Sequence, residues 1–346
     1  MVELKTISGH NMYDMASLMQ KAIRRGEKNN AIYAALELSY KYRSMMWNRI
    51  CVIASEDCWG IISKEILKLR KEDEEVKSKE SIIKAVSLLC DNKKSRDGCY
   101  FSCNFILTDD IVPKINEEIQ LNEELDIQII NYKESMMRLS FNIDSEKIYY
   151  ETLLYKYIDT KEYEILGYAT RMMYYKYNED LWKELMLISD KRTGSILTKE
   201  ISALKQIDNK VNGKRTKEKK DLIFVAKAIM LFIYYFTGEY QNLLGLENMD
   251  YFEELKEIDI QEGPYKLAND EIPEYTFDLH TLKGKERGAT DVEMTISEQE
   301  ALYPKEKDYF GECGWQNYYD MVIRKGQMGD KEKHQYEEFK KDRKLK

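Results

Sequence analysis

A shortage of proline is the sequence feature that most constrains the fold. Only 4 of the 346 residues are proline, and 3 of these lie beyond residue 260. Proline breaks helix interiors and is common in turns, so its near-absence favours long helices over a turn-rich β-sandwich. Charged residues make up 34% of the chain, which suits helices with solvated faces, and the 43% of apolar residues suffice for a packed core. The sequence therefore predicts a mostly α protein.

Helical periodicity is clearest in the first hundred residues. Apolar side chains recur every three or four residues over Met12–Ile23, with Asn11 in front of them as a cap. Similar runs cover residues 32–40, 47–54 and 82–90. Because short connections make neighbouring helices antiparallel, these runs predict an N-terminal bundle of four or five helices.

Later segments have other patterns. Over residues 137–144 apolar and polar side chains alternate, which is the period of a half-buried strand. Helical spacing then returns, and the prolines beyond residue 260 make the end of the chain less regular. We therefore expect a helical domain over 1–98, a mixed segment with a small β hairpin over 99–146, a second helical region over 147–260, and a less regular region with a charged tail over 261–346.

Charge is distributed unevenly along the chain. The formal net charge is −8, which excludes a uniformly basic nucleic-acid coat but not local basic patches. Residues 205–220 hold 7 basic and 2 acidic side chains, or +5, whereas residues 239–278 hold 2 basic and 12 acidic ones, or −10. The basic run is the strongest candidate for contacting phosphate. The tyrosines nearby, Tyr174, Tyr175 and Tyr177, could stack on bases or belong to the core.

Basic side chains in three places are candidates for binding nucleic acid or another anion. One group follows the first predicted helix, one lies in the basic run, and one surrounds two glycines that permit close backbone approach. The first and third groups also have plainer interpretations, as a solvated helix end and as a surface turn with a hydrogen-bonded histidine. The candidates are Lys21, Arg24, Arg25, Lys214, Arg215, Lys217, Lys219, Lys220, His280, Lys283, Lys285 and Arg287.

Motifs of enzymatic chemistry are missing from the sequence. It contains no P-loop, dinucleotide-binding glycine motif, zinc-protease motif or nucleophile elbow. Cys99 and Cys103 lack the second pair of ligands that zinc needs, and the 3 histidines offer few general bases. We therefore predict a non-enzymatic protein with no metal and no cofactor. An enzyme that uses the glycine-rich loop 280–288 as an anion site, with His280 as its titrating group, is kept as an alternative.

Signals for membrane insertion are also missing. The N-terminal residues lack the apolar core of a signal peptide. The most apolar run, residues 222–236, is shorter than the ~20 residues that span a bilayer, and Lys227 interrupts it. We expect no membrane partner and a cytoplasmic location.

An ordered series of motifs lies within residues 10–96. It reads His10-x-x-Tyr13-Asp14-x-x-Ser17-x-x-x-Lys21-x-x-Arg24, then Ala31-x-Tyr33, then Arg49-x-x-x-x-Ala54-Ser55-Glu56-Asp57. This order resembles the segment that follows the ATPase core in the replication-associated recombination protein A family, which are AAA+ proteins related to clamp loaders. The resemblance covers under a third of the chain and implies a helical, oligomer-forming collar. The structural residues that it implies are Tyr13, Asp14, Ser17, Tyr33, Arg49, Ser55, Glu56 and Asp57.

The chain also departs from that family. There the segment follows a nucleotide-binding module, whereas here it begins near residue 10, so the resemblance carries over the collar and no ATPase. The tripeptide 58–60 reads Cys-Trp-Gly where the family has Ile-Gly. From the residues alone, Asp14 suits the positive end of its helix dipole, and Ser55, Glu56 and Asp57 can form hydrogen bonds that tie one helix to the next.

Two further functional hypotheses follow. The first is a non-enzymatic homo-oligomer related to the collar of a replication or recombination ATPase, acting at DNA or at a replication complex. The second is a protein-interaction module, of a kind that a phage or other mobile element could encode, which binds or blocks a host protein without contacting DNA. The acidic stretch 239–278 favours the second, because acidic surfaces repel phosphate and suit basic partners.

Overall fold

A computed structural model describes residues 4–106, 145–216, 219–238, 265–267, 270–306, 308–310 and 314–342. Over these residues the chain is mostly helical, with isolated β-bridges and no strand, which confirms the predicted mostly α class. Residues 97–106, at the start of the predicted mixed segment, are helical. The alternating residues 137–144, on which the predicted hairpin depended, lie outside the described residues.

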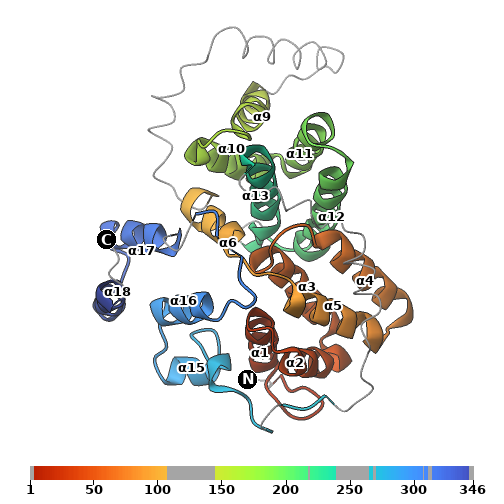
Figure 1. Ribbon diagram of the computed structural model, residues 1–346, viewed down its shortest axis with the longest axis vertical. Coiled ribbons are helices and arrows are strands. Elements are labelled where there is room, and N and C mark those ends of the chain that lie inside the picture. Colours follow the sequence, from red (N-terminus) through yellow and green to blue (C-terminus); the bar gives the residue numbers. More distant parts are fainter. Residues whose placement is uncertain are drawn as a thin grey trace. The chain divides into compact units, whose positions relative to one another are not determined.

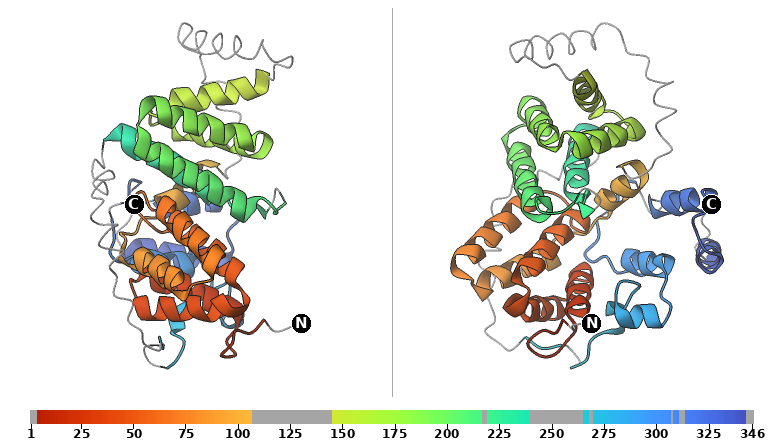
Figure 2. Two further views of the ribbon diagram at one scale, coloured as in Figure 1. Left: turned by 90° about the vertical axis from the view of Figure 1, so that its right-hand side faces the viewer. Right: turned by 180° about the vertical axis from the view of Figure 1, so that it is seen from behind.

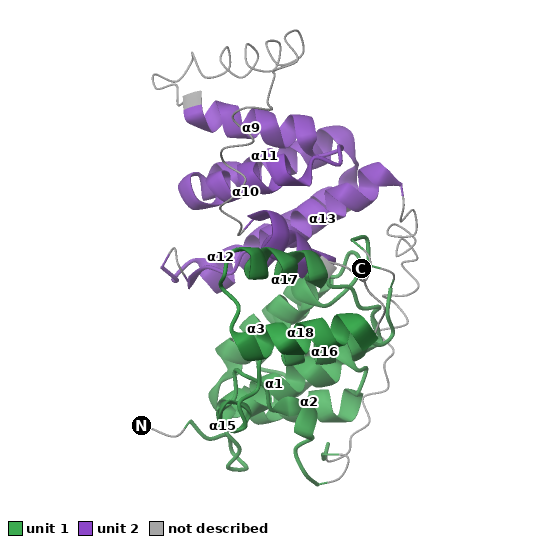
Figure 3. Cartoon of the chain, turned by 90° about the vertical axis from the view of Figure 1, so that its left-hand side faces the viewer, with its two compact units in different colours: residues 1–96, 248–346 green, residues 97–247 purple. Residues whose placement is uncertain are grey.

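The chain divides into two compact units. Unit 1 comprises residues 1–96 and 248–346, and unit 2 comprises residues 97–247 (Figure 3). The C-terminal region that we expected as a separate part over 261–346 therefore shares a unit with the N-terminal helices. Its residues pack on that bundle.

Unit 1 begins with a bundle of five helices, and the apolar stripe of each faces its neighbours. In the first helix Met15, Leu18, Met19 and Ile23 are fully buried, and the side chain of Asn11 accepts a hydrogen bond from the backbone of the first turn, as the sequence predicts. The helices are α1 (Met12–Arg24), α2 (Lys28–Lys41), α3 (Arg43–Glu56), α4 (Ser63–Val76) and α5 (Lys79–Asp91).

The C-terminal part of unit 1 returns to this bundle. Its elements are the 3-10 turn η4 (Glu274–Thr276) and the helices α15 (Leu282–Glu286), α16 (Asp291–Glu300), α17 (Gly314–Arg324) and α18 (Asp330–Asp342). The backbone N–H of Tyr303 donates to the carbonyl of Arg24 at 2.8 Å, and that of Lys94 donates to the carbonyl of Pro304 at 2.7 Å. Figures 1 and 2 show α15 and α16, in blue, beside the N-terminal helices in red.

Unit 2 is a second helical bundle, shown in purple in Figure 3. Its elements are α6 (Asp97–Phe101), the π-helical turn η1 (Ser102–Ile106), α9 (Ser145–Tyr157), α10 (Tyr163–Lys176), α11 (Asn178–Arg192), α12 (Ser195–Asn212) and α13 (Ile223–Thr237). Residues Ile223 to Tyr234 of α13 are all buried, which explains why this run is so apolar. Among the described helices, none is both long and apolar enough to span a bilayer.

Candidate functional site

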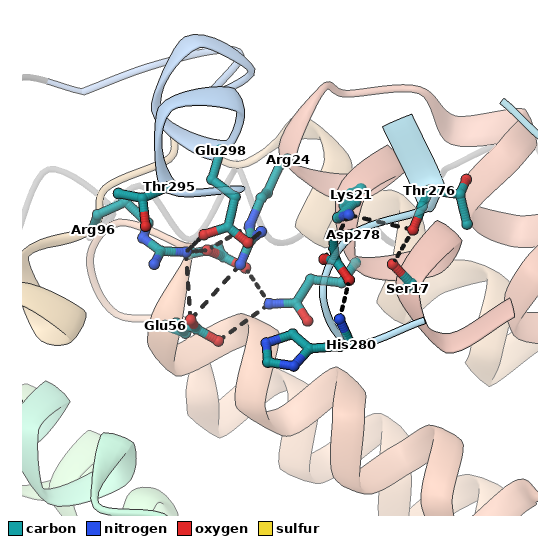
Figure 4. Close-up of polar contacts among 12 residues, drawn as sticks. Ser17, Lys21, Arg24, Glu56, Arg96, Thr276, Asp278, His280, Thr295 and Glu298 are labelled. Carbon is teal, nitrogen blue, oxygen red and sulfur yellow. Dashed lines mark hydrogen bonds and ion pairs between the residues drawn. The ribbon is translucent and has the colours of Figure 1, made fainter. Parts of the chain in front are cut away.

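Six polar side chains from distant parts of unit 1 meet in one buried cluster, here called the ion-pair cluster (Figure 4). They come from α1, from the end of α3, from the segment after α5 and from α16. Two arginines face three carboxylates, so the cluster carries a formal charge of −1 when every group is ionised. Its members are Gln20, Arg24, Glu56, Asp57, Arg96 and Glu298.

Arg24 lies at the centre of the cluster with 2% of its side chain exposed. Its Nε donates to Oδ1 of Asp57 at 2.9 Å, and its Nη1 donates to Oε1 of Glu298. Glu56 is a third carboxylate neighbour, with 3.7 Å between Nη2 of Arg24 and its Oε1. One guanidinium thus joins the ends of α1 and α3 to the C-terminal helix α16.

Arg96 approaches the same three carboxylates. Its Nη1 lies 3.0 Å from Oδ1 of Asp57, 3.2 Å from Oε2 of Glu298 and 3.4 Å from Oε1 of Glu56. Gln20 completes the set, because its Nε2 donates to both Glu56 and Asp57 at 3.1 Å. Every charge in the cluster therefore has an opposite charge in contact, which is the condition under which buried ions are tolerated.

The pKa values of the two adjacent acids of the cluster, Glu56 and Asp57, are shifted in opposite directions. Burial alone would raise the pKa of Asp57, but the guanidinium groups of Arg24 and Arg96 outweigh it and hold that pKa below its usual range. The pKa of Glu56 is raised, first by burial and then by the Asp57 carboxylate beside it. Asp57 is therefore the principal counter-ion of the two arginines.

A second buried ion pair lies one turn earlier on α1. Nζ of Lys21 lies 2.6 Å from Oδ2 of Asp278, and the same ammonium donates to the carbonyl of Thr276 at 3.3 Å. Ser17 donates to that carbonyl at 2.6 Å. Burial lowers the pKa of Lys21 despite Asp278, and Lys21 in turn holds the pKa of Asp278 below its usual range against the effect of burial. Successive turns of α1 thus bind one C-terminal loop.

The expected cationic face on α1 is wrong for two of its three members. Lys21 and Arg24 are 7% and 2% exposed and their charges are taken up inside unit 1. The C-terminal segment covers helix α1, and the pattern of the N-terminal residues alone cannot predict this contact. Arg25 is half-buried, with its guanidinium 4.0 Å from the centre of the Tyr275 ring.

Asp278 also organises the loop that the sequence suggested as an anion site. Its Oδ1 accepts from the backbone N–H of His280 at 2.8 Å, and its carbonyl accepts from the hydroxyl of Thr281 at 2.9 Å. A Cβ added to Gly284 would lie 1.8 Å from that carbonyl oxygen. The glycine therefore permits a close approach to the chain's own backbone, which agrees with the interpretation as a turn, whereas the anion-site interpretation needs an approach to a bound anion.

The basic residues of this loop are exposed, and two of them have partners on either side of it in the sequence. Lys283 lies 2.6 Å from Oε1 of Glu274, and Arg287 donates to the carbonyl of Phe277 at 2.7 Å and pairs with Glu293 at 2.9 Å. Lys285 is exposed, and so is the ring of His280.

The other residues of the family-like motif have local roles in unit 1. Oη of Tyr33 lies 2.9 Å from Nε2 of His10. The guanidinium of Arg49 donates to the side-chain oxygen of Gln20 at 3.3 Å. Within α3, the hydroxyl of Ser55 donates to the carbonyl of Cys51. Tyr13 is 58% exposed, and Asp14 is half-buried in the first turn of α1.

In unit 2, the described residues of the predicted basic run form the end of α12 and the segment before α13. Residues 213–216 and 219–220 of that segment are here called the basic loop. Asn212 closes this loop: its Oδ1 accepts from the backbone N–H of Asp221 at 2.9 Å, and its Nδ2 donates to the carbonyl of Asp221 at 2.8 Å. Nδ2 also donates to Oδ1 of Asp208 at 2.7 Å. The two ends of the loop are therefore fastened to each other and to the core of unit 2.

The one acidic side chain that the structure describes within residues 205–220, Asp208, points inward. It is 2% exposed and accepts hydrogen bonds from Trp182 at 2.9 Å and Tyr174 at 2.8 Å. Tyr174 is thus a core residue, which rules out its stacking on bases, while Tyr175 and Tyr177 are half-buried.

The cations of the basic loop are more exposed than Asp208, although Nη1 of Arg215 donates to Oδ1 of Asn212 at 3.4 Å and Nζ of Lys220 lies 5.9 Å from the centre of the Tyr174 ring. Lys214, Arg215 and Lys219 are exposed and Lys220 is half-buried, whereas Lys217 lies outside the described residues. The described part of this loop therefore offers exposed cations to solvent, whereas Asp208, the acidic side chain described within residues 205–220, is buried.

Comparison with known proteins identifies no relative: no family model, no curated protein and no solved structure matches the chain. Within the described residues, no group of three or more histidine, cysteine, aspartate or glutamate side chains is arranged to hold a metal ion.

Proposed function

We propose that the chain is a non-enzymatic, oligomeric helical protein related to the collar of a replication or recombination AAA+ ATPase, and that it acts at nucleic acid. Its phosphate contact is the basic loop of unit 2. The observation that carries this proposal is the exposure of Lys214, Arg215 and Lys219 in a loop whose ends are joined by the hydrogen bonds between Asn212 and Asp221.

Preorganisation supports this role for the loop. A flexible cationic segment loses conformational freedom on binding, and that loss weakens the complex. Here the hydrogen bonds between Asn212 and Asp221 fix both ends of the loop before any ligand arrives. Phosphate contacts of this kind give affinity without reading sequence, so we expect binding to depend on salt far more than on base sequence.

The relation to a collar rests on how the motif residues are used in unit 1. Arg24, Glu56 and Asp57 meet in the ion-pair cluster, and Ser17 and Lys21 bind Thr276 and Asp278 one turn earlier on α1. These motif residues therefore all serve buried polar contacts within unit 1. This favours a shared helical framework over a chance match of separate short motifs.

The proposal is tested by measuring the affinity of the full chain for single- and double-stranded oligonucleotides across a salt series. Three or four phosphate contacts predict that log K falls with log salt with a slope of about −3 on duplex and about −2 to −3 on single strands. Light scattering in parallel should give a mass above that of one chain. Failure to bind either oligonucleotide at low ionic strength would reject the nucleic-acid role.

Replacing Asn212 by alanine should weaken nucleic-acid binding without removing a charge. The variant loses both hydrogen bonds to Asp221, so the basic loop is no longer fixed, and we expect an affinity roughly three- to tenfold lower, equivalent to about 1 kcal/mol. Asn209→Ala, at an exposed position on the same helix, is the matched control. Equal affinities for the two variants would show that fixing the loop has no part in binding.

A further inference from the structure

A groove in unit 1 separates α16 from α18. It encloses about 600 Å³, which lies within the range of about 300–1,000 Å³ that is usual for binding pockets. Val292 and Ile296 of α16 and Phe339 of α18 are among the residues that line it, and Arg25 of α1 also contributes. We propose that this groove docks a segment of a partner protein that carries a large apolar side chain flanked by lysines or arginines. The proposal is independent of the nucleic-acid role of unit 2.

The apolar side chains that line the groove pack against other residues of unit 1. Val292 is fully buried, and Phe339 packs against Trp315 with 4.9 Å between ring centres. Ile296 is half-buried, although it lies between two helices of a folded unit. A side chain inserted from outside would cover the exposed parts of Ile296 and Phe339, and each Å² of apolar surface removed from water contributes about 25 cal/mol.

The charged lining sets the sign of the partner. Four carboxylates, Glu293, Glu300, Glu338 and Asp342, and one guanidinium, Arg25, give the groove a formal charge of −3. Partial neutralisation comes from Arg287, which pairs with Glu293 at 2.9 Å. Such a field attracts cationic segments and repels nucleic acid, which identifies a basic peptide as the favoured occupant.

Two of the carboxylates are placed to receive a cation. Glu338 contacts His334 at 3.3 Å, both side chains being exposed, and Asp342 is exposed at the end of α18. Arg25 cannot neutralise the whole groove, because it supplies one positive charge against four carboxylates. Its guanidinium lies over the Tyr275 ring and donates to the carbonyl of Lys21 at 3.1 Å. A lysine or arginine beside an apolar anchor would therefore meet carboxylates of α18, and Glu300 of α16 also lines the groove.

The test uses a short synthetic peptide with a central leucine pair flanked by lysines, added to the full chain and measured by calorimetry. Removing two groove charges with Glu300→Gln and Glu338→Gln should weaken binding about tenfold, since each exposed ion pair is worth up to about 1 kcal/mol. The control, Glu72→Gln with Glu75→Gln, removes the same charge from exposed positions on α4 and should change affinity less than twofold.

A third variant separates apolar docking from charge attraction. Ile296→Ser leaves the groove charge unchanged and should also weaken peptide binding several-fold. No binding of the lysine–leucine peptide, equal losses from the groove and α4 pairs, or no effect of Ile296→Ser would each overturn the proposal. So would a finding that the groove pair abolishes self-association of the chain, because the occupant would then be a second copy.

Discussion

Replacing Arg24 by methionine is expected to destabilise unit 1 by about 3–5 kcal/mol, the cost of breaking a buried ion pair by removing one partner. Methionine fills much of the same space, so the loss is mainly electrostatic. Asp57 and Glu298 would remain buried and share one arginine, Arg96, where they now have two. Because domains are commonly stable by only about 5–15 kcal/mol, this change would remove much of the free energy of unfolding of unit 1.

Hydrogen exchange is the suitable readout, because it reports α1, α3 and α16 separately from the helices of unit 2. The neighbouring variant Arg25→Met is the control: that side chain is half-buried and makes a cation–π contact worth about 1 kcal/mol. We expect faster exchange across unit 1 for Arg24→Met alone. Similar exchange in both variants would mean that the ion-pair cluster does not hold unit 1 together.

Gly284→Ala is the second change with a large expected effect. The added methyl group would occupy a position 1.8 Å from the carbonyl oxygen of Asp278 and 2.7 Å from its backbone nitrogen, so the turn must open. Opening the turn moves Asp278 away from Lys21 and leaves a buried ammonium without its carboxylate. By comparison with other overpacked or unpaired buried sites, we expect a loss of about 2–4 kcal/mol.

The matched control for this change is Gly329→Ala, where an added Cβ meets nothing within 4 Å. Thermal unfolding of the two variants should differ clearly, with only Gly284→Ala lowering the midpoint. If the two midpoints agree, the close contact between Gly284 and Asp278 has no energetic consequence, and the loop 278–288 does not depend on it.

Local features of the fold could be predicted from the sequence. The helix at Met12–Arg24 and its Asn11 cap follow from spacing and cap chemistry, which involve neighbouring residues only. The apolar run before residue 236 is a buried helix for the same reason. Helical class, too, is a sum of such local preferences, which explains its agreement with the structure.

The partners of the buried charges could not be predicted. Glu298 meets Arg24 across 274 positions of sequence, and Asp278 meets Lys21 across 257, so no periodicity relates them. The basic side chains on α1 therefore look like a solvated face until the C-terminal segment is placed over them. No sequence pattern marked Arg96 as a member of the ion-pair cluster, because a single arginine after a helix is common.

The basic loop shows the opposite case. Its charge was evident from composition, but its geometry was not, because that geometry depends on Asn212 and on the inward orientation of Asp208. An asparagine next to Gly213 suggests only a turn. Asn212 is linked through Asp208 to Trp182 and Tyr174. These hydrogen bonds form only when the helices α10, α11 and α12 are packed together.

The measurement that tests the central claim most directly compares the salt dependence of DNA binding in two triple variants. One neutralises the basic loop with Lys214→Gln, Arg215→Gln and Lys219→Gln. The other removes the same charge from exposed sites of unit 1 with Arg324→Gln, Lys333→Gln and Lys341→Gln. The proposal predicts that the loop variant alone lowers the slope of log K against log salt, by about 2–3 on duplex DNA. Equal slopes for the two variants would contradict it.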